Sequence, residues 1–446
     1  MKLKSLDELF RCFSFVTPDY QRGYAWGIAQ VNDFWNDIGR IGMANPQHFT
    51  GTLILEVAQT KSMHAVATVV DGQQRLTTAV LLAAAVSESL HLRGLTEEAA
   101  SFRGTFLGSK DAPAFRYGPG HDTWPFLALQ LFQDASIVAR AGQFRSAYTR
   151  NLECALDLLR GRVKVLSGAE LTELVVKFRS KLVFNVVEVD PAQFNIHVAF
   201  ESINHRGKQL TRLELLKNRL IYIATVMSMP EGETVASWES CKKSLREAVN
   251  KTWGDIYSWL GREGAEALDD EEFLRTHSII YFEGDTGERD WLETLLFNTK
   301  FSAESAINGS LEMGEISCYL NSLSLSALLW SHQRRPRGMP ATQILWLNRI
   351  NHVRRQMFEP LILAAYIRLI GDEYALATDL TKTAGVDDAL IQLLKEIERF
   401  IVLVFMVTGR RSHTGRKEFA VLAHALHERS GHYAGDATES FQYLTR

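Results

Sequence analysis

The stretch Val69–Thr78 constrains the fold of this 446-residue chain more than any other. A β-branched run ends at Asp71-Gly72, a dipeptide typical of sharp turns, and an apolar pattern of helical spacing begins directly afterwards. A strand that turns tightly into a helix directs backbone N–H groups and the positive end of the helix dipole to one place. The stretch therefore predicts an anion site. The alternative is an ordinary polar connection between a strand and a helix.

The polar residues of this turn indicate a division of labour at such a site. Arg75 follows Asp71 by four residues, one helical turn, so the carboxylate can orient the guanidinium or hold a divalent ion beside a phosphate. Gln73 or Gln74 could position a water for in-line attack on that phosphate. The sequence has no Gly-x-x-x-x-Gly-Lys-Ser/Thr stretch, which excludes a P-loop enzyme.

Charge and cysteine content exclude several classes of protein. The net charge is -3, so no global basic field attracts nucleic acid, and any DNA contact must come from local patches. The four cysteines lie far apart and form no Cys-x-x-Cys pair, which argues against a zinc ribbon and a disulfide framework. The acidic start and the lack of a long apolar segment predict a cytoplasmic protein that is neither exported nor membrane-spanning.

The pattern of the first 220 residues alternates strands with helices. We expect helices at Ser5–Phe10, Val31–Ile41 and Leu76–Leu90, a short one at His197–Ile203 and another from Thr211, and strands at Phe13–Val16, Phe49–Val57, Ala65–Val70 and Leu182–Val189. Gly51 predicts a bulge or a close backbone approach. Residues 91–180 are expected to be a helical insertion, broken by a loop at Ser109–Pro125.

The remainder of the chain reads as helical. Apolar and aromatic residues recur at helical spacing beyond Ile221, and the polar segment His332–Gly338 is expected to be an exposed loop. The predicted fold class is therefore α+β, with a mixed domain over 1–220 and a large α-helical domain over 221–446. We place this boundary near residue 220.

Two further segments have compositions suited to recognition. Tyr20–Trp26 combines aromatic rings with Gln21 and Arg22, which suits base stacking and phosphate or base-edge contacts, and the alternative is an aromatic loop packed on the core. The loop after residue 203 offers anion-binding groups close to the start of a helix, and the alternative is an ordinary solvated loop between helices. Its candidate residues are Asn204, Arg206 and Lys208, followed by Lys217 and Asn218 on the helix.

Four segments, in this order, resemble the GmrS-type domain. They are Tyr20–Trp26, Phe49–Thr52, Val70–Thr77, and Phe200–Asn204 continued by Leu216–Asn218. That domain is the ParB-like and sulfiredoxin-like N-terminal part of GmrSD modification-dependent restriction systems and of SspE-like defence proteins that sense phosphorothioate. The resemblance covers about residues 1–220. It implies a small mixed-sheet domain.

The resemblance also implies a function. A nucleoside triphosphate, GTP or ATP, is expected to bind with Mg²⁺, and its hydrolysis is expected to regulate a nuclease that attacks modified phage DNA. Catalysis would fall to Asp71, Gln74 and Arg75, with Asp71 as the metal ligand. Nucleotide binding would use Gln21, Arg22, Gly51, Asp71, Gly72, Gln73, Gln74, Arg75 and Thr77, together with Asn204, Arg206, Lys208 and Lys217. Tyr20, Tyr24 and Trp26 would line the same pocket or read the DNA modification.

The C-terminal region departs from the family pattern. Members usually end in an HNH-type nuclease domain, and nothing after residue 400 matches one. His424 and His427 fit a packed or solvated pair on a helix, and Arg410 and Arg411 belong to a basic loop that could contact DNA or be a plain surface loop. Either this chain is a sensor subunit that acts with a separate nuclease, or the sequence is the N-terminal part of a longer protein.

Three functions remain open at the level of sequence. The first is the nucleotide-hydrolysing sensor, which could assemble as a homo-oligomer. The second is a non-catalytic DNA-binding or scaffold module. The third is a ParB-like nickase in which Asp71 holds a metal ion.

Overall fold

The computed structural model describes residues 3–42, 46–57, 64–118, 121, 123–133, 146–190, 210–261, 267–282, 290–353, 356–370, 387–411, 414–428 and 437–445. Contacts divide the chain into two compact units, Met1–Leu210 and Thr211–Arg446, except that Gly261–Gly264 belongs with the first. The helix predicted at His197–Ile203 and the loop residues Asn204, Arg206 and Lys208 lie outside the described residues.

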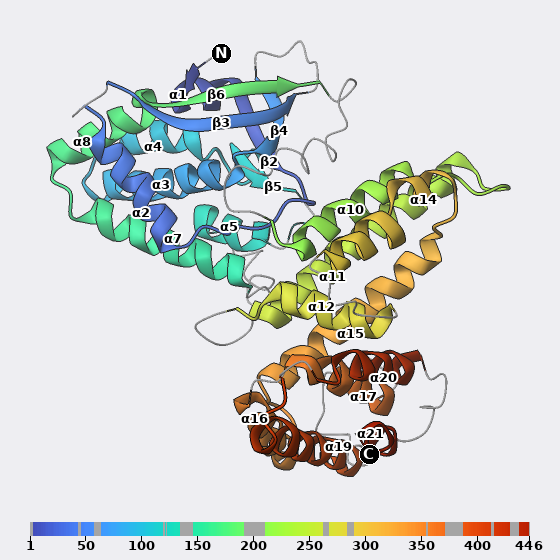
Figure 1. Ribbon diagram of the computed structural model, residues 1–446. Helices are drawn as coiled ribbons and strands as arrows, with labels where there is room; N and C mark the ends of the chain where they lie inside the picture. Colours follow the sequence, from blue (N-terminus) through green and yellow to red (C-terminus); the bar gives the residue numbers. More distant parts are fainter. Residues whose placement is uncertain are drawn as a thin grey trace. The chain divides into compact units, whose positions relative to one another are not determined.

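The described strands of the first unit form one mixed sheet (Figure 1). Its order is β1-β6-β3-β4-β2-β5, with antiparallel pairing of β1 to β6 and β3 to β4 and parallel pairing elsewhere. The bounds are β1 Leu3–Ser5, β2 Phe13–Thr17, β3 His48–Val57, β4 Ala65–Asp71, β5 Phe115–Tyr117 and β6 Leu182–Val189. The register of β3 against β6 shifts between Phe49 and Gly51, which confirms the predicted bulge.

Helix α3 (Gln73–Leu92) is the central helix of this unit. Nearly every side chain from Leu76 to Leu90 is buried, as the continuous apolar pattern predicts. It lies along the sheet and packs against α4 and α7 (Figure 1). The other helices of the unit are α1 Leu6–Cys12, α2 Ile28–Arg40, α4 Thr96–Phe106, α5 Thr123–Phe132, α7 Ala147–Lys164, α8 Gly168–Val176 and the π-helix η1 Lys177–Lys181.

The region predicted as a helical insertion needs one correction. Residues Phe115–Tyr117, placed in the expected loop Ser109–Pro125, form β5 and pair with β2 at the edge of the sheet. Three residues give too short a run for a period-2 pattern to stand out, so the surrounding Gly and Pro dominated the prediction. This stretch therefore supplies a strand as well as helices to the first unit.

Every described secondary-structure element of the second unit is a helix. Its helices are α10 Arg212–Val226, α11 Val235–Gly261, α12 Asp270–Tyr281, α13 Trp291–Glu293, η2 Thr294–Lys300, α14 Ala303–Ile307, α15 Met313–Arg334, α16 Ala341–His352, η3 Gln356–Phe358, α17 Glu359–Ile370, α19 Asp387–Phe400, η5 Ile401–Val407, α20 Arg416–Glu428 and α21 Ala437–Thr445. Helix α17 packs against α15 and α20, and α19 against α16 and α21.

The prediction of an exposed loop at His332–Gly338 is wrong for its first part. Helix α15 continues to Arg334, and the side chains of His332 and Gln333 are buried. Both residues hydrogen-bond inside the unit: His332 Nδ1 contacts the backbone oxygen of Arg337, and Gln333 Nε2 donates to that of Glu359. Burial of polar side chains by such bonds is invisible to a hydropathy pattern.

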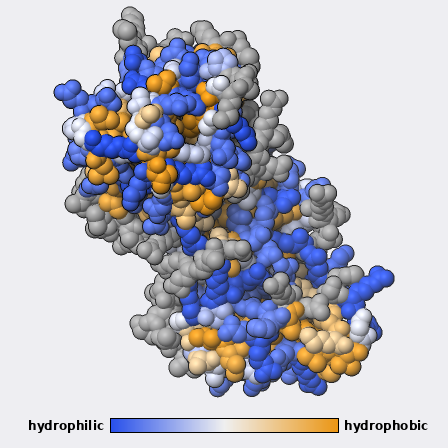
Figure 2. All heavy atoms as spheres, turned by 90° about the vertical axis from the view of Figure 1, so that its left-hand side faces the viewer, coloured by the Kyte–Doolittle hydropathy of each residue, from blue (hydrophilic) through white to orange (hydrophobic). Residues whose placement is uncertain are grey.

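Hydrophobic residues on the face drawn in Figure 2 occur in separate groups among hydrophilic ones. Among the described residues, the π-helix η5 exposes four apolar side chains, Val402, Leu403, Met406 and Val407. None of the described helices combines the length and the apolar character that a membrane crossing requires.

Candidate nucleotide-phosphate site

The turn between β4 and α3 has the backbone geometry of an anion site. β4 ends at Asp71, Gly72 adopts a φ of 98°, and α3 begins at Gln73. The N–H of Leu76 bonds the backbone oxygen of Gly72, so the amides of Gln73, Gln74 and Arg75 precede the first intrahelical bond. These donors and the dipole of a 20-residue helix favour a negative charge at this point.

Two glycines make room for this arrangement. A Cβ on Gly72 would lie 2.3 Å from Cδ2 of Leu53, and the positive φ also favours glycine. At Gly51, with a φ of 127°, a Cβ would lie 2.1 Å from Nη1 of Arg75. The bulge in β3 and the absence of a side chain at residue 51 thus leave space for the Arg75 guanidinium.

Arg75 is held by two oxygens. Nη1 donates to the backbone oxygen of Thr52 at 2.9 Å, and Nη2 lies 3.8 Å from Oδ2 of Asp71. The sequence predicted this Asp71–Arg75 pairing. The two side chains are 35% and 22% exposed, so both remain accessible to a ligand. Burial raises the pKa of Asp71, and the Arg75 charge and the Gly72 amide oppose that rise.

Gln74 has a structural role that the sequence did not indicate. Its Oε1 accepts from the Ala25 amide at 2.8 Å, and its Nε2 donates to the Gly23 oxygen at 2.9 Å. Both ends of the amide therefore bind the backbone of Tyr20–Trp26. Gln74 holds that segment against the start of α3, and its amide is occupied in the structure.

Gln73 and Gln21 each keep one unused acceptor. Gln73 Nε2 donates to the Arg22 oxygen at 3.3 Å, and Gln21 Nε2 donates to the oxygens of Val69 and Val70 at 2.6 and 2.8 Å. These bonds fix the orientation of both amides. Oε1 of each side chain is buried and has no hydrogen-bond partner among the described residues. A buried acceptor without a donor is costly, which makes both oxygens candidates for ligand or water contacts.

The aromatic side chains of Tyr20–Trp26 mostly pack inside the unit. Tyr24 is 0% exposed and its hydroxyl lies 2.7 Å from Oγ1 of Thr78. Tyr20 is buried as well, and Trp26 packs on Phe34 at a centroid distance of 6.4 Å. The predicted DNA contact by Tyr24 therefore does not fit this structure, because a ring with no exposed surface cannot stack on a base. The alternative of an aromatic loop packed on the core fits Tyr24.

Other residues support the segment from outside the sequence motifs. His121 Nε2 lies 3.0 Å from the backbone oxygen of Gln21, and its ring packs on Tyr117 at 4.5 Å. The Tyr117 hydroxyl lies 3.2 Å from Oγ1 of Thr77. Thr77, one of the predicted nucleotide-binding residues, is therefore buried in the interior. His121 follows Gly118-Pro119-Gly120 in the sequence, and no signal in the sequence marked it.

The remaining predicted residues belong to the second unit. Lys217 is buried on α10, and Arg410 and Arg411 are exposed after η5. Nδ1 of His424 lies 2.9 Å from the Ile280 oxygen, and the ring of His427 packs on Tyr281. These two histidines thus pack against α12, so of the two predicted alternatives, a packed or a solvated pair, the structure has the packed one.

The donors at the start of α3 fit a phosphate. The described residues contain no group of three or more His, Cys, Asp or Glu that could hold a metal ion. Asp71 alone suits Mg²⁺ that is bound mainly by phosphates and water, the usual arrangement for this ion in nucleotide sites.

The first unit is thus a mixed-sheet domain with a candidate anion site at the turn between β4 and α3. Residues 6–221 match the family described as GmrSD restriction endonuclease, N-terminal domain. This match confirms the resemblance that the four sequence motifs predicted. The mixed sheet and the helical remainder are confirmed, and the likeness to ParB and sulfiredoxin stays a prediction. No curated protein matches the chain significantly.

Proposed function

We propose that the GmrSD N-terminal domain of this chain binds a nucleoside triphosphate and hydrolyses it, and that this controls DNA cleavage in a restriction system. The observation that carries the proposal is the placement of Arg75 beside the N-terminus of α3, where Gly51 leaves space for its guanidinium. The match to a restriction endonuclease family supports DNA as a partner. A separate HNH-type nuclease would then cut the DNA.

The residues have distinct roles in this proposal. The first amides of α3 and the Arg75 guanidinium bind phosphate oxygens, and Asp71 holds Arg75 in position and is the carboxylate available to Mg²⁺. Bound Mg²⁺ would neutralise charge on the phosphates. Oε1 of Gln73, rather than the occupied amide of Gln74, is the acceptor left to orient a water.

Arg75→Ala tests the proposal directly. We expect the variant to fold and to lose nucleotide binding or turnover, measured by calorimetry and phosphate release over the four NTPs. Arg40→Ala is the matched control, since that side chain is 74% exposed at the end of α2. Unchanged affinity and turnover in Arg75→Ala would contradict the proposed site.

A second experiment tests the link to DNA. We expect modified DNA to change the rate of NTP turnover by the wild-type chain, whereas unmodified DNA of the same sequence does not. DNA binding with a steep salt dependence and no effect of any nucleotide would instead favour a non-catalytic DNA-binding module. Plasmid nicking by the purified chain that Asp71→Ala abolishes would favour the nickase.

A further inference from the structure

A pocket in the second unit has no part in the proposed phosphate site. Its volume is about 400 Å³, and residues of α12, α15, α16, η3 and α17 line it. The polar lining consists of Glu272, Gln333, Arg334, Asn351, Gln356 and Glu359. Ile350 and Ile362 supply apolar wall. The size lies in the range of small-molecule sites.

Among the described residues, the charged groups that line this pocket are two carboxylates and one guanidinium. Nη2 of Arg334 lies 3.1 Å from Oε2 of Glu272, and Nη1 donates to Oε1 of Glu359. Glu359 also accepts from Nε1 of Trp330 at 2.9 Å, and burial raises the pKa of its carboxyl although Arg334 opposes the rise. Because one guanidinium contacts both carboxylates, the described part of the lining carries one net negative charge when its groups are ionised. An anionic ligand would find Arg334 already occupied.

Gln333 adds an unused acceptor to this lining. Its side chain is 2% exposed, and its Nε2 donates to the Glu359 oxygen at 3.4 Å, which fixes the orientation of the amide. Oε1 is buried and has no hydrogen-bond partner among the described residues. The backbone oxygen of Gln333 accepts from Nδ2 of Asn351 at 2.9 Å, so the end of α15 is anchored there. A donor from a ligand would satisfy the amide oxygen.

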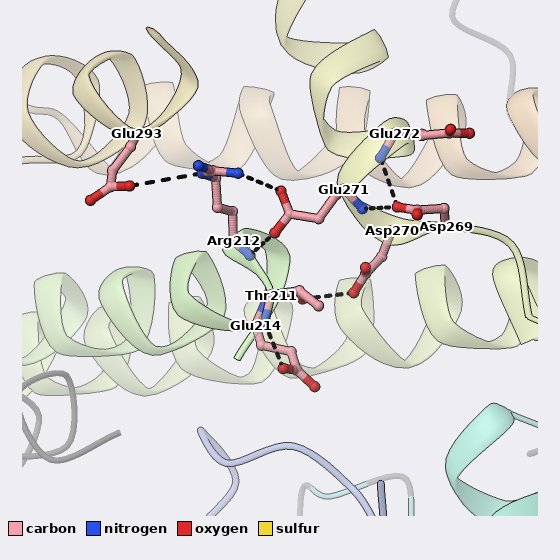
Figure 3. Close-up of polar contacts among 8 residues, drawn as sticks. All are labelled: Thr211, Arg212, Glu214, Asp269, Asp270, Glu271, Glu272 and Glu293. Carbon is pink, nitrogen blue, oxygen red and sulfur yellow. Dashed lines mark hydrogen bonds and ion pairs between the residues drawn. The ribbon is translucent and has the colours of Figure 1, made fainter. Parts of the chain in front are cut away.

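Glu272 takes no part in the contacts that the two preceding residues of α12 make with the start of α10. Asp270 and Glu271 bind Thr211 and Arg212 at the start of α10, whereas Glu272 points away from them (Figure 3). On its other side Oε1 of Glu272 accepts from Gln356. Oε2 faces Arg334 without hydrogen-bond geometry. The carboxylate therefore has capacity for a further donor.

We propose that this pocket binds a small organic cation with N–H groups, a guanidinium or primary ammonium compound. Glu272 is its counter-ion, Oε1 of Gln333 accepts one of its N–H groups, and Ile350 and Ile362 contact its carbon chain. A donor-bearing cation matches both the excess negative charge and the unused acceptor. The proposal is independent of nucleotide binding by the first unit.

Calorimetric titration of the full chain with agmatine and putrescine tests the proposal. We expect saturable binding of at least one of them, and none of butanediol, which has the length of putrescine without its charge. Glu272→Gln and Gln333→Leu should each weaken binding about tenfold or more, since each loses a hydrogen bond to a charged group. Glu418→Gln, an exposed position on α20, should bind as the wild type does.

Three results would overturn this assignment. They are no saturable binding of either amine by the wild type, equal binding of butanediol and putrescine, and equal weakening by Glu418→Gln and Glu272→Gln. Thermal unfolding of each variant separates lost binding from lost folding. Glu272→Gln keeps the shape and the hydrogen-bonding capacity of the side chain, so a folded variant is expected.

Discussion

Gly51 brings the backbone of β3 close to the guanidinium of Arg75, and this contact gives the first prediction. Gly51→Ala would place a methyl group 2.1 Å from Nη1 at a φ of 127°, which an L-residue rarely adopts. We expect a loss of about 1–3 kcal/mol in the free energy of unfolding. We also expect weaker nucleotide binding, because Arg75 must leave its place. Urea unfolding and nucleotide titration measure the two effects.

Gly39 provides the matched control for that substitution. It lies in α2, no atom would come within 4 Å of an added Cβ, and its φ is not positive. Gly39→Ala should therefore leave nucleotide binding unchanged and stabilise the helix by about 0.5–1 kcal/mol. If Gly51→Ala binds nucleotide as well as Gly39→Ala does, the position of Arg75 is not important for the site.

The two glutamines at the start of α3 should differ in what they affect. Gln74→Leu removes the buried bonds to the Ala25 amide and the Gly23 oxygen, with an expected loss of about 1–3 kcal/mol for each. Gln73→Leu breaks one long bond at 3.3 Å, so the stability loss should be smaller, about 1 kcal/mol or less. Instead, Gln73→Leu should lower NTP turnover about tenfold or more with little change in nucleotide affinity.

Chemical unfolding and steady-state kinetics of both variants check this division. A Gln74→Leu variant that is as stable as the wild type would show that its bonds to the Tyr20–Trp26 segment contribute little. Normal turnover by Gln73→Leu would remove the water-orienting role from Gln73.

At the scale of elements, local signals predicted much of the fold. The helices predicted from Ser5 and Thr211 are present, and each begins with a capping box, completed by Glu8 and Glu214, that depends only on neighbours in sequence. Strand β6 has the predicted bounds, since four valines and Phe184, residues of high β-propensity, mark it. The turn at Asp71-Gly72 was equally local, and its Gly72 conformation is the one expected of that dipeptide.

Contacts between distant segments could not be predicted in the same way. The bonds of Gln74 to Gly23 and Ala25 span about fifty residues of sequence, and the side-by-side packing of β2 and β4 brings the two segments together. The burial of Tyr24 depends on the same packing. Residue types alone therefore identified the residues around the turn but could not separate those that support the segment from those free to meet a ligand.

The first turn of α12 carries the clearest pH dependence. Burial raises the pKa of Asp270 from 3.8 to about 6, and the hydrogen bond from Oγ1 of Thr211, 2.7 Å away, opposes that rise (Figure 3). The folded state therefore binds the proton more tightly than the unfolded state does. The stability that this proton gives is full below pH 3.8 and is lost as pH rises through about 6.

Asp270→Asn isolates this contribution. Between pH 4 and 7 the unfolding free energy of the wild type should fall relative to that of the variant by on the order of 2–3 kcal/mol, since one pKa unit corresponds to about 1.4 kcal/mol. Asp388→Asn, an exposed position on α19, should show no such difference. A constant difference between wild type and Asp270→Asn across this range would contradict the raised pKa.

At the scale of the whole molecule, the two compact units have separate proposed ligands. The proposed phosphate site at Asp71–Arg75 lies in the first unit, and the pocket lined by Glu272 and Gln333 lies in the second. A ligand that binds only the folded state stabilises the unit that holds its site. The gain is about 2.7 kcal/mol when the free ligand concentration is 100 times the Kd. The two ligands should therefore protect different backbone amides from hydrogen exchange.

Hydrogen exchange followed by mass spectrometry measures this protection. A non-hydrolysable nucleoside triphosphate should slow exchange in peptides of β4 and the first turn of α3, and Arg75→Ala should abolish that effect. Agmatine or putrescine should slow exchange at the start of α12 and at the end of α15, and Glu272→Gln should abolish it. Each variant loses the binding of one ligand and keeps that of the other. Protection by nucleotide in Glu272→Gln and by amine in Arg75→Ala therefore shows that both variants are folded. Loss of both effects in either variant would mean that the two sites are not independent.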